Sequence, residues 1–369
     1  MEDWLSDEQV EAFLGDGVLV VENVLSADEV DRYCQGCSKT LASFGVDDQC
    51  WDKASGKALS CLSSTNGSGG VLDIFYPDWK MDLSMHPKFF AMTRQLWKAA
   101  YCHDGEAKED LSKENQFKWH PYGKFDPNKG YVYIDRIGYR LPTKLSEEIG
   151  EMVNTSVKKK KQRALQRSLT PHLDCCPETI YKNAPKWRPI QSFISLTDNL
   201  EANTGGFEAA RGFHLEFNEW SQHRPPTISS HKEKDGSKTE VSIPPACVGQ
   251  YTHIRPKEDR EIMDRVVHIP VKAGSAVFWD NRIPHANSYN HNGDHPRIVV
   301  YASFLPDVEL NRSYIRNQLA NWKIQRPPTD TWINVGENGD DAPDEINDIR
   351  ASTYEFARLG RKLMGMDPW

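Results

Sequence analysis

Hydrophobic positions near the start of the chain follow helical spacing, then strand spacing, then helical spacing again. Ser6-Asp-Glu-Gln9 has the form of a capping box and predicts a helix that begins there. Gly15-Asp-Gly17 interrupts this helix, and the apolar run Val18–Val21 predicts a buried strand. A second capping box, Ser26-Ala-Asp-Glu29, predicts another helix that extends to about Leu41.

The next third of the chain predicts a loop, a helix, a strand and a basic helix. Residues Asp47–Gly70 are rich in Ser, Gly and Cys and are typical of a loop, whereas Pro87–Tyr101 has the apolar spacing of a helix. Tyr131–Arg140 alternates as a strand does, and Ser146–Leu169 has helical character. The last segment contains six basic residues, Lys158, Lys159, Lys160, Lys161, Arg163 and Arg167. They form either a solvated face or a basic rim near a pocket for an anionic substrate.

Short β-type runs dominate from Ile190 to Phe304, where β-branched and aromatic residues alternate with Gly, Asn, Asp and Pro. The polar segment Gln222–Arg265 is too long for a simple hairpin and predicts an inserted loop or lid. After Phe304 the chain is charged and helical, with a last helix over Tyr354–Met364. We therefore expect a mainly β fold with flanking helices: an antiparallel sandwich or barrel with the N-terminal helices packed outside it.

Composition narrows the class of protein. The 369 residues have a net charge of −8, which disfavours generic binding to nucleic acid or to an anionic membrane. No apolar run is long enough to span a bilayer, and the N-terminus lacks the pattern of a signal peptide, so a soluble cytoplasmic chain is expected. Of the eight cysteines, Cys34 and Cys37 form a C-x-x-C without a second pair, which favours reduced thiols on a helix face over disulfides, zinc or redox chemistry.

Two histidines are followed two residues later by a carboxylate, in His172-Leu-Asp174 and His214-Leu-Glu216. Residues two apart on a strand face the same side, so both side chains of such a pair can reach one metal ion. His285 is a candidate third ligand because it follows a strand-like segment and a turn. Two histidines and one carboxylate would leave three positions open on iron. Arg297, twelve residues after His285, opens the next strand and could bind a carboxylate bidentately.

Four segments, in this order along the chain, resemble the phytanoyl-CoA dioxygenase (PhyH)-like family of Fe(II)/2-oxoglutarate-dependent dioxygenases. They are the opening Leu5–Val30, the His172-x-Asp174 pair, Asn203–His214, and Val277–Arg297. The chain departs from the family where Pro-Gly-Ser-His reads Arg211-Gly-Phe-His214 and where the 222–265 insert lengthens the chain. Substrate-facing loops vary most within such a family, and no Gly-rich phosphate loop is present, so the acyl-CoA substrate is not carried over.

The resemblance implies a single domain over 1–369 with a double-stranded β-helix (a cupin-like jelly-roll) at its core. Residues 1–130 would support this core, 131–305 would form it together with the 222–265 insert, and 306–369 would be a helical tail. The implied iron ligands are His172, Asp174 and His285, and Arg297 would bind the distal carboxylate of 2-oxoglutarate. Gln191 and Asn287 would also contact this co-substrate, unless they are ordinary polar residues at strand ends. His214 is expected to be structural.

The reaction implied is hydroxylation of an unactivated carbon, with O2 as oxidant, succinate and CO2 as products and ascorbate as a candidate reductant. Asp174 disfavours halogenation, whereas desaturation, epoxidation and ring closure stay open. Candidate substrate-facing residues are Tyr139, Arg140, Trp279 and Arg282, with core packing or surface ion pairs as the alternative. The expected partner is a small-molecule substrate, with an anion as one candidate, bound to a monomer or dimer. The alternatives are the same iron chemistry on a protein side chain or nucleobase, and an inactive jelly-roll binding protein.

Overall fold

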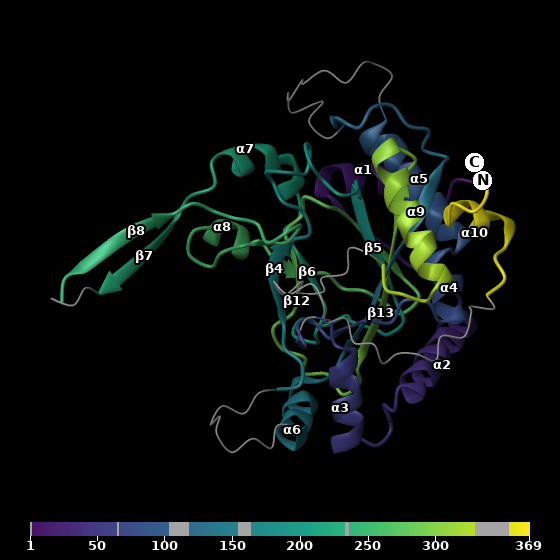
Figure 1. Cartoon of the computed structure of the whole chain (residues 1–369), viewed down its shortest axis with the longest axis horizontal. Coiled ribbons are helices and arrows are strands. Elements are labelled where there is room, and N and C mark those ends of the chain that lie inside the picture. The colour runs from purple at the N-terminus through teal and green to yellow at the C-terminus, as the bar shows by residue number, and fades with distance from the viewer. Residues whose placement is uncertain (1, 65, 103–117, 154–163, 233–235, 329–353) are drawn as a thin grey trace.

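Two antiparallel sheets lie at the centre of the computed structural model, which describes residues 2–64, 66–102, 118–153, 164–232, 236–328 and 354–369 (Figure 1). The six-stranded sheet has the order β1 (Val18–Val21), β11 (Ala276–Asp280), β5 (Ile190–Ser195), β13 (Arg297–Pro306), β3 (Gly130–Arg140), β2 (Val71–Leu72). The five-stranded sheet has the order β10 (Val267–His268), β6 (Phe207–Ala209), β12 (His285–Asn287), β4 (Leu169–Leu173), β9 (Thr252–His253). The expected antiparallel β architecture is therefore present.

Both faces of the six-stranded sheet are buried. Along β11, Ala276 and Phe278 belong to the larger hydrophobic core, whereas Val277 and Trp279 belong to a second core. This alternation is the two-residue period of a strand. Because each face of the sheet meets a different layer, its strands have nearly continuous apolar runs rather than an alternation of apolar and polar residues.

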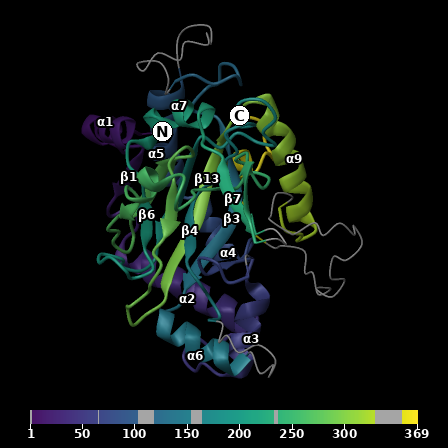
Figure 2. The ribbon, with the colours of Figure 1, turned by 90° about the vertical axis from the view of Figure 1, so that its left-hand side faces the viewer.

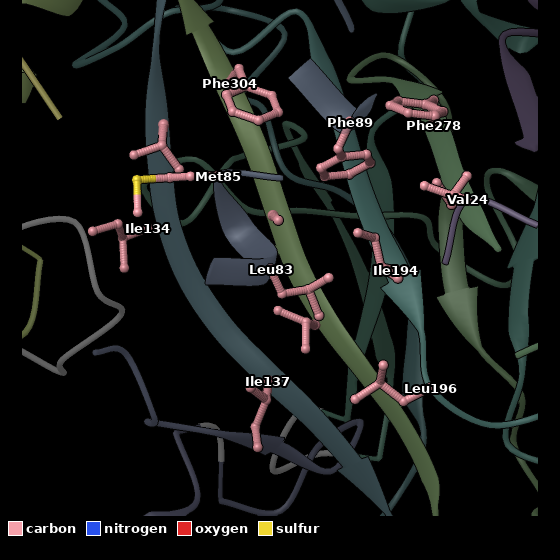
Figure 3. Packing of buried hydrophobic residues seen from close by; sticks show 14 of the residues in the cluster. Val24, Leu83, Met85, Phe89, Ile134, Ile137, Ile194, Leu196, Phe278 and Phe304 are labelled. Atoms are coloured by element: carbon pink, nitrogen blue, oxygen red, sulfur yellow. The ribbon is translucent and has the colours of Figure 1, made fainter. Parts of the chain in front are cut away.

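Helices cover the outer face of the larger sheet. They are α1 (Asp7–Asp16), α2 (Ala27–Ser43), α4 (Asp78–Ser84) and α5 (Pro87–Tyr101) from the N-terminal part, with α10 (Arg358–Leu363) from the C-terminal part. Helix α9 (Glu309–Lys323) instead packs its Tyr314 and Ile315 against Tyr133 and Leu305. Figure 3 shows Phe89 of α5 next to Phe278 and Phe304; the ring centroids lie 5.1 and 5.7 Å from that of Phe89. Figure 2 shows α1 and α9 on opposite sides of the strands. The predicted outer layer of helices is confirmed.

The second core fills the space between the two sheets. The ring of Phe193 on β5 lies 5.5 Å from that of Phe207 on β6, and Phe207 lies 5.0 Å from Trp279. These aromatic contacts join the larger sheet to the smaller one, and they leave β4 and β12 facing the inside of the sandwich.

The two capping boxes form as predicted. Ser6 accepts a hydrogen bond from the backbone N–H of Gln9, and Ser26 accepts one from Glu29. Helix α1 ends at Asp16, and its C-cap Gly17 has a φ of 67°, in the left-handed region that glycine adopts at low cost. The local sequence therefore determines where both helices begin and where α1 ends.

One predicted loop is wrong, because residues 47–70 contain helix α3 (Lys53–Leu62). Asp52 caps it by accepting a hydrogen bond from the N–H of Ser55. Gly56 has no side chain because a Cβ there would lie 2.4 Å from Cγ2 of Ile149, on helix α6 (Thr143–Val153). The small residues that suggested a loop are thus the ones that let two helices pack closely.

The basic segment predicted as a helix over 146–169 is only partly described. Helix α6 begins at Thr143 and ends at Val153, and Leu169 already belongs to β4. Lys158–Lys161 and Arg163 lie outside the described residues. Arg167, which is exposed, stands just before β4.

The insert at 222–265 has regular structure. Strands β7 (Thr227–Lys232) and β8 (Lys238–Ile243) form a hairpin that projects from the body of the molecule (Figure 1). Helix α7 (Phe217–Gln222), following the 3-10 turn Phe213–Leu215, precedes the hairpin, and β9 and helix α8 (Arg260–Met263) follow it. No helix in the described part of the chain combines the length and apolar character that a membrane crossing requires.

The cysteine prediction is wrong at one place. Cys176 and Cys247 form a disulfide that joins the loop after β4 to the insert. The two residues are 71 positions apart in the chain, so no short motif marks them. Cys34 and Cys37 do lie on a helix, α2, as free thiols.

Candidate metal centre

His172, Asp174 and His285 come together on the inner face of the smaller sheet. His172 on β4 and His285 on β12 are register partners, and Asp174 directly follows β4. Nε2 of His172 lies 3.5 Å from Oδ1 of Asp174, and Nε2 of His285 lies 3.6 Å from Oδ2. All candidate ligand atoms lie within 4.8 Å of one another. Ligands at about 2.1 Å from one ion stand roughly 3 to 4 Å apart, so these positions fit a shared metal.

Backbone carbonyls orient both imidazoles. Nδ1 of His172 lies 2.8 Å from the carbonyl oxygen of Thr170, and Nδ1 of His285 lies 3.0 Å from that of Ile283. A carbonyl can only accept, so each Nδ1 carries the proton and each Nε2 presents its lone pair to the centre of the group. Burial, with the neighbouring His172, lowers the pKa of His285, which keeps this ring neutral. The donor set is therefore ready to bind a divalent metal.

Two donors hold the Asp174 carboxylate. Nε2 of Gln191 donates to its Oδ2 at 3.0 Å, and Nη2 of Arg188 lies 3.9 Å from the same oxygen. Burial alone would raise the pKa of Asp174, but hydrogen bonds and charge interactions with the two histidines hold it well below its ordinary value. The carboxylate is therefore ionised, as a metal ligand must be.

Arg297, at the start of β13, is almost fully buried. Its Nη1 donates to Oδ1 of Asn287 at 3.2 Å, and its guanidinium lies 5.2 Å from the ring centroid of Phe193. Burial lowers its pKa. Among the described residues, no carboxylate lies within ion-pair distance of Arg297, so a buried positive charge is available to an anionic ligand.

A cavity of about 520 Å³ opens onto the triad. This volume is typical of a small-molecule site. Besides the three candidate ligands, the side chains around it include Gln191, Asn287, Trp279, Tyr133, Asp135, Arg136, Arg167, Lys186, Arg188, Tyr251 and His253. The ring of Tyr251 stacks on His172 at 4.8 Å, so the insert contributes a wall next to the candidate metal ligands.

The four candidate substrate residues differ in position. Trp279 lines the cavity, and its ring lies 5.1 Å from that of His285. Tyr139 is not at the cavity, because its ring packs in the larger hydrophobic core. Arg282 is not there either, since its Nε lies 2.7 Å from Oδ1 of Asp280 in a fully buried ion pair. Arg140 is buried beside Arg297, its register partner, and does not line the cavity.

His214 does not belong to the group of candidate metal ligands. Its Nε2 lies 3.0 Å from the carbonyl oxygen of Leu14, and a Cβ on Gly17 would lie 2.4 Å from its Nδ1. This histidine therefore packs the start of the chain against the segment that follows β6.

The sequence interpretation missed Lys186 and Arg188. Both belong to a segment that precedes β5 and carries no recognisable motif, and they reach the site only because β5 runs beside β13 and β11. The sequence interpretation also missed Tyr251 and His253, which lie in the insert and line the cavity. The only sequence signal for this side of the cavity is the group of basic residues that precedes β5.

Comparison with known proteins relates the chain to one family and one fold. A family model described as Gig2-like matches residues 188–366, just under half of the chain. The crystal structure of GlcNAc Inducible Gene 2 (GIG2, DUF1479) from Candida albicans is similar with a TM-score of 0.65 and 17% identity, over 100% of this chain and 78% of that one. A hypothetical protein, JW0805, from Escherichia coli has a TM-score of 0.62 and 14% identity, over 98% and 82%.

A search of curated proteins found no match. The two structural likenesses define a class of fold that this chain shares over nearly its whole length. At such low identity they carry no residue roles, so the chemistry follows from the side chains of this chain.

Proposed function

We propose that the chain is an Fe(II)- and 2-oxoglutarate-dependent dioxygenase of the PhyH-like type that hydroxylates a carbon of a small molecule. The observation that supports this proposal most strongly is the group formed by His172, Asp174 and His285. Their two Nε2 atoms and one carboxylate come together at the cavity. Two histidines and one carboxylate that leave positions open are the donor set of non-heme iron oxygenases. We assign the two facing antiparallel sheets to a jelly-roll core of a single domain.

Arg297 supports the choice of 2-oxoglutarate. It is 3% exposed, and its guanidinium donates to the amide oxygen of Asn287. A dicarboxylate that chelated the metal at one end would place its other carboxylate toward Arg297, where a charge-assisted bidentate pair is favourable in the dry surroundings. Asn287 would then hold the guanidinium in position.

Bound iron would supply the redox chemistry that couples O2 reduction to decarboxylation of the co-substrate and oxidation of a carbon. In the balanced reaction, 2-oxoglutarate, O2 and R–H give succinate, CO2 and R–OH, with one oxygen atom in succinate and one in the alcohol. The chain's own residues position the reactants: Gln191 orients Asp174, and Trp279 and Phe207 exclude water from one side of the triad.

Anaerobic titration of the metal-free protein with Fe(II) and 2-oxoglutarate tests this proposal. We expect the visible charge-transfer band of the chelate, followed by succinate release when O2 is admitted. Arg297→Ala should lose the band at moderate co-substrate concentration, whereas Arg260→Ala, at an exposed arginine, should keep it. Iron that fails to bind would favour a binding protein without catalysis, and iron binding without 2-oxoglutarate would favour an oxygenase with another reductant.

A further inference from the structure

The turn that joins β11 to β12 is built around one buried carboxylate, that of Asp280. Its Oδ1 accepts hydrogen bonds from the backbone N–H of Arg282 at 3.0 Å and from Nε of Arg282 at 2.7 Å. Nη2 of Arg282 donates to Oδ2 at 3.0 Å, and the hydroxyl of Tyr101 donates to the same oxygen. Backbone and side-chain donors therefore converge on a single acid at the end of β11.

This carboxylate fixes the backbone that leads to His285. The carbonyl of Asp280 accepts a hydrogen bond from the N–H of Ile283 at 2.9 Å, and its side chain holds Arg282, the residue before Ile283. The carbonyl of Ile283 lies 3.0 Å from Nδ1 of His285 and accepts its proton. The direction of that carbonyl sets which nitrogen of His285 is protonated and how its ring is oriented. Asp280 is thus linked to a candidate iron ligand through the backbone of one turn.

The same turn contacts the segment that carries the carboxylate ligand. The carbonyl oxygen of Asn281 lies 3.4 Å from Sγ of Cys175, the residue that directly follows Asp174. The N–H of Asn281 donates to the carbonyl of Pro189 at 3.0 Å, just before β5. A shift of this turn would therefore change the position of His285 relative to Asp174, and with it the arrangement of donors around a bound ion.

A buried ion pair is a costly way to stabilise a fold. Asp280 is 0% and Arg282 is 1% exposed, and apolar side chains of similar volume often give the same stability as such a pair or more. Burial alone would raise the pKa of Asp280, but the charge and hydrogen bonds of Arg282 hold it below its ordinary value. The pair is therefore ionised, and directional hydrogen bonds to the turn are what it provides beyond apolar packing.

Resting on the proposed function, we propose that Asp280 and Arg282 are positioning residues for the metal centre. Their ion pair holds the turn so that the carbonyl of Ile283 orients His285 toward the ion. Neither side chain lines the cavity, so the pair acts through His285 rather than on the substrate. Loss of such an outer contact typically lowers metal affinity by about 10- to 100-fold.

Titration of the metal-free whole chain with Co(II) tests this proposal, because the visible spectrum of Co(II) and the proton resonances that it shifts report ligand geometry. Each bound imidazole with a protonated Nδ1 gives one exchangeable resonance far outside the normal range, so His172 and His285 should give one each. Asp280→Asn should lower Co(II) affinity about tenfold, change the visible spectrum, and move or abolish one of the two resonances.

Asp307→Asn is the matched control. Asp307 also accepts hydrogen bonds from a tyrosine and an arginine, Tyr131 and Arg312, both at 2.7 Å. It follows the end of β13 opposite to Arg297 and makes no contact with the turn between β11 and β12. This variant should keep the affinity, the spectrum and both resonances of the wild type.

A double variant separates positioning from folding. Asp280→Leu combined with Arg282→Met replaces the ion pair by apolar side chains, so it should keep the fold and a thermal midpoint close to that of the wild type. Its Co(II) affinity should still fall about tenfold, and the same resonance should move. Wild-type affinity and spectrum in Asp280→Asn or in the double variant would overturn the proposal. A wild-type chain that does not bind Co(II) would instead reject the proposed metal centre, so the two failures are distinct.

Discussion

Arg140 on β3 and Arg297 on β13 are direct register partners, and both guanidiniums are buried. Neighbours across an antiparallel pair share one face, so two positive charges lie next to each other. Burial, together with Arg297, lowers the pKa of Arg140 to about 10. Nε and Nη1 of Arg140 have no hydrogen-bond partner among the described residues. Such an arrangement is costly to the metal-free protein and favourable to an anion bound nearby.

Arg140→Met should therefore stabilise the protein when no ligand is present. We expect the free energy of unfolding to rise by about 1 kcal/mol or more, because a buried like-charge pair is removed and the volume is nearly kept. Urea unfolding of the metal-free chain at pH 7 measures the change. Arg260→Met, at an exposed position, is the control and should leave the midpoint where it is. A lower midpoint in Arg140→Met would contradict the repulsion between the two arginines.

Asp174→Ala should abolish retention of Fe(II) and leave the fold intact. The carboxylate is the one anionic candidate ligand, and its side chain is at the surface of the cavity rather than within a hydrophobic core. Metal content after gel filtration and far-UV circular dichroism measure the two effects. Glu178→Ala, at an exposed acid in the following loop, should retain iron. Iron that stays bound in Asp174→Ala would show that the ligand assignment is wrong.

Lys80 gives a prediction for the pH dependence of stability. It is fully buried on α4, its Nζ donates to the carbonyl of Phe75 at 3.1 Å, and burial lowers its pKa to about 7. A lowered lysine pKa means that the unfolded chain holds the proton more tightly, so this group destabilises the fold fully below pH 7. The penalty shrinks as the pH rises from 7 toward the ordinary value of 10.5.

Lys80→Met should accordingly raise the free energy of unfolding at pH 7, by on the order of a few kcal/mol, and by much less near pH 10. Chemical unfolding at several pH values measures this convergence. Lys182→Met, at an exposed lysine, should follow the wild type throughout. A gain from Lys80→Met that does not depend on pH would show that packing, rather than charge burial, sets the difference.

The Cys176–Cys247 disulfide should stabilise the cavity wall. It closes a long loop between the strand that carries His172 and the insert that carries Tyr251, so its loss should cost about 2–4 kcal/mol. Cys247→Ser should lower the thermal midpoint, while the band of the iron chelate persists because no candidate ligand is changed. Cys50→Ser, at an exposed free thiol, is the control. Identical midpoints for wild type and Cys247→Ser would argue against the bond in solution.

Local chemistry decided what could be predicted from the sequence. Capping boxes at Ser6 and Ser26, and the two-residue spacing of His172 and Asp174, depend on neighbours in the chain and were readable. Helix α3 could not be predicted from the sequence, because Gly56 lowers helix propensity. Its glycine is explained only by the packing of this position against Ile149.

Features that depend on residues distant in the sequence could not be predicted. The disulfide partners are 71 residues apart, and Lys186 and Arg188 reach the candidate metal centre through strand order rather than through any motif. Arg282 was expected to face the substrate, whereas it forms a buried ion pair with Asp280. The sequence therefore predicted the candidate metal ligands but not the basic residues that line the cavity beside them.

Strand β11 links the helical layer to the candidate metal centre through two consecutive residues. Phe278 contacts Phe89 on the outer side, and Trp279 contacts His285 on the inner side. A change at Phe89 therefore stands only a few van der Waals contacts from a proposed iron ligand, in a close-packed interior that transmits displacement. Substitutions in the helical layer, and not only those around the cavity, would therefore be expected to displace the proposed metal ligands.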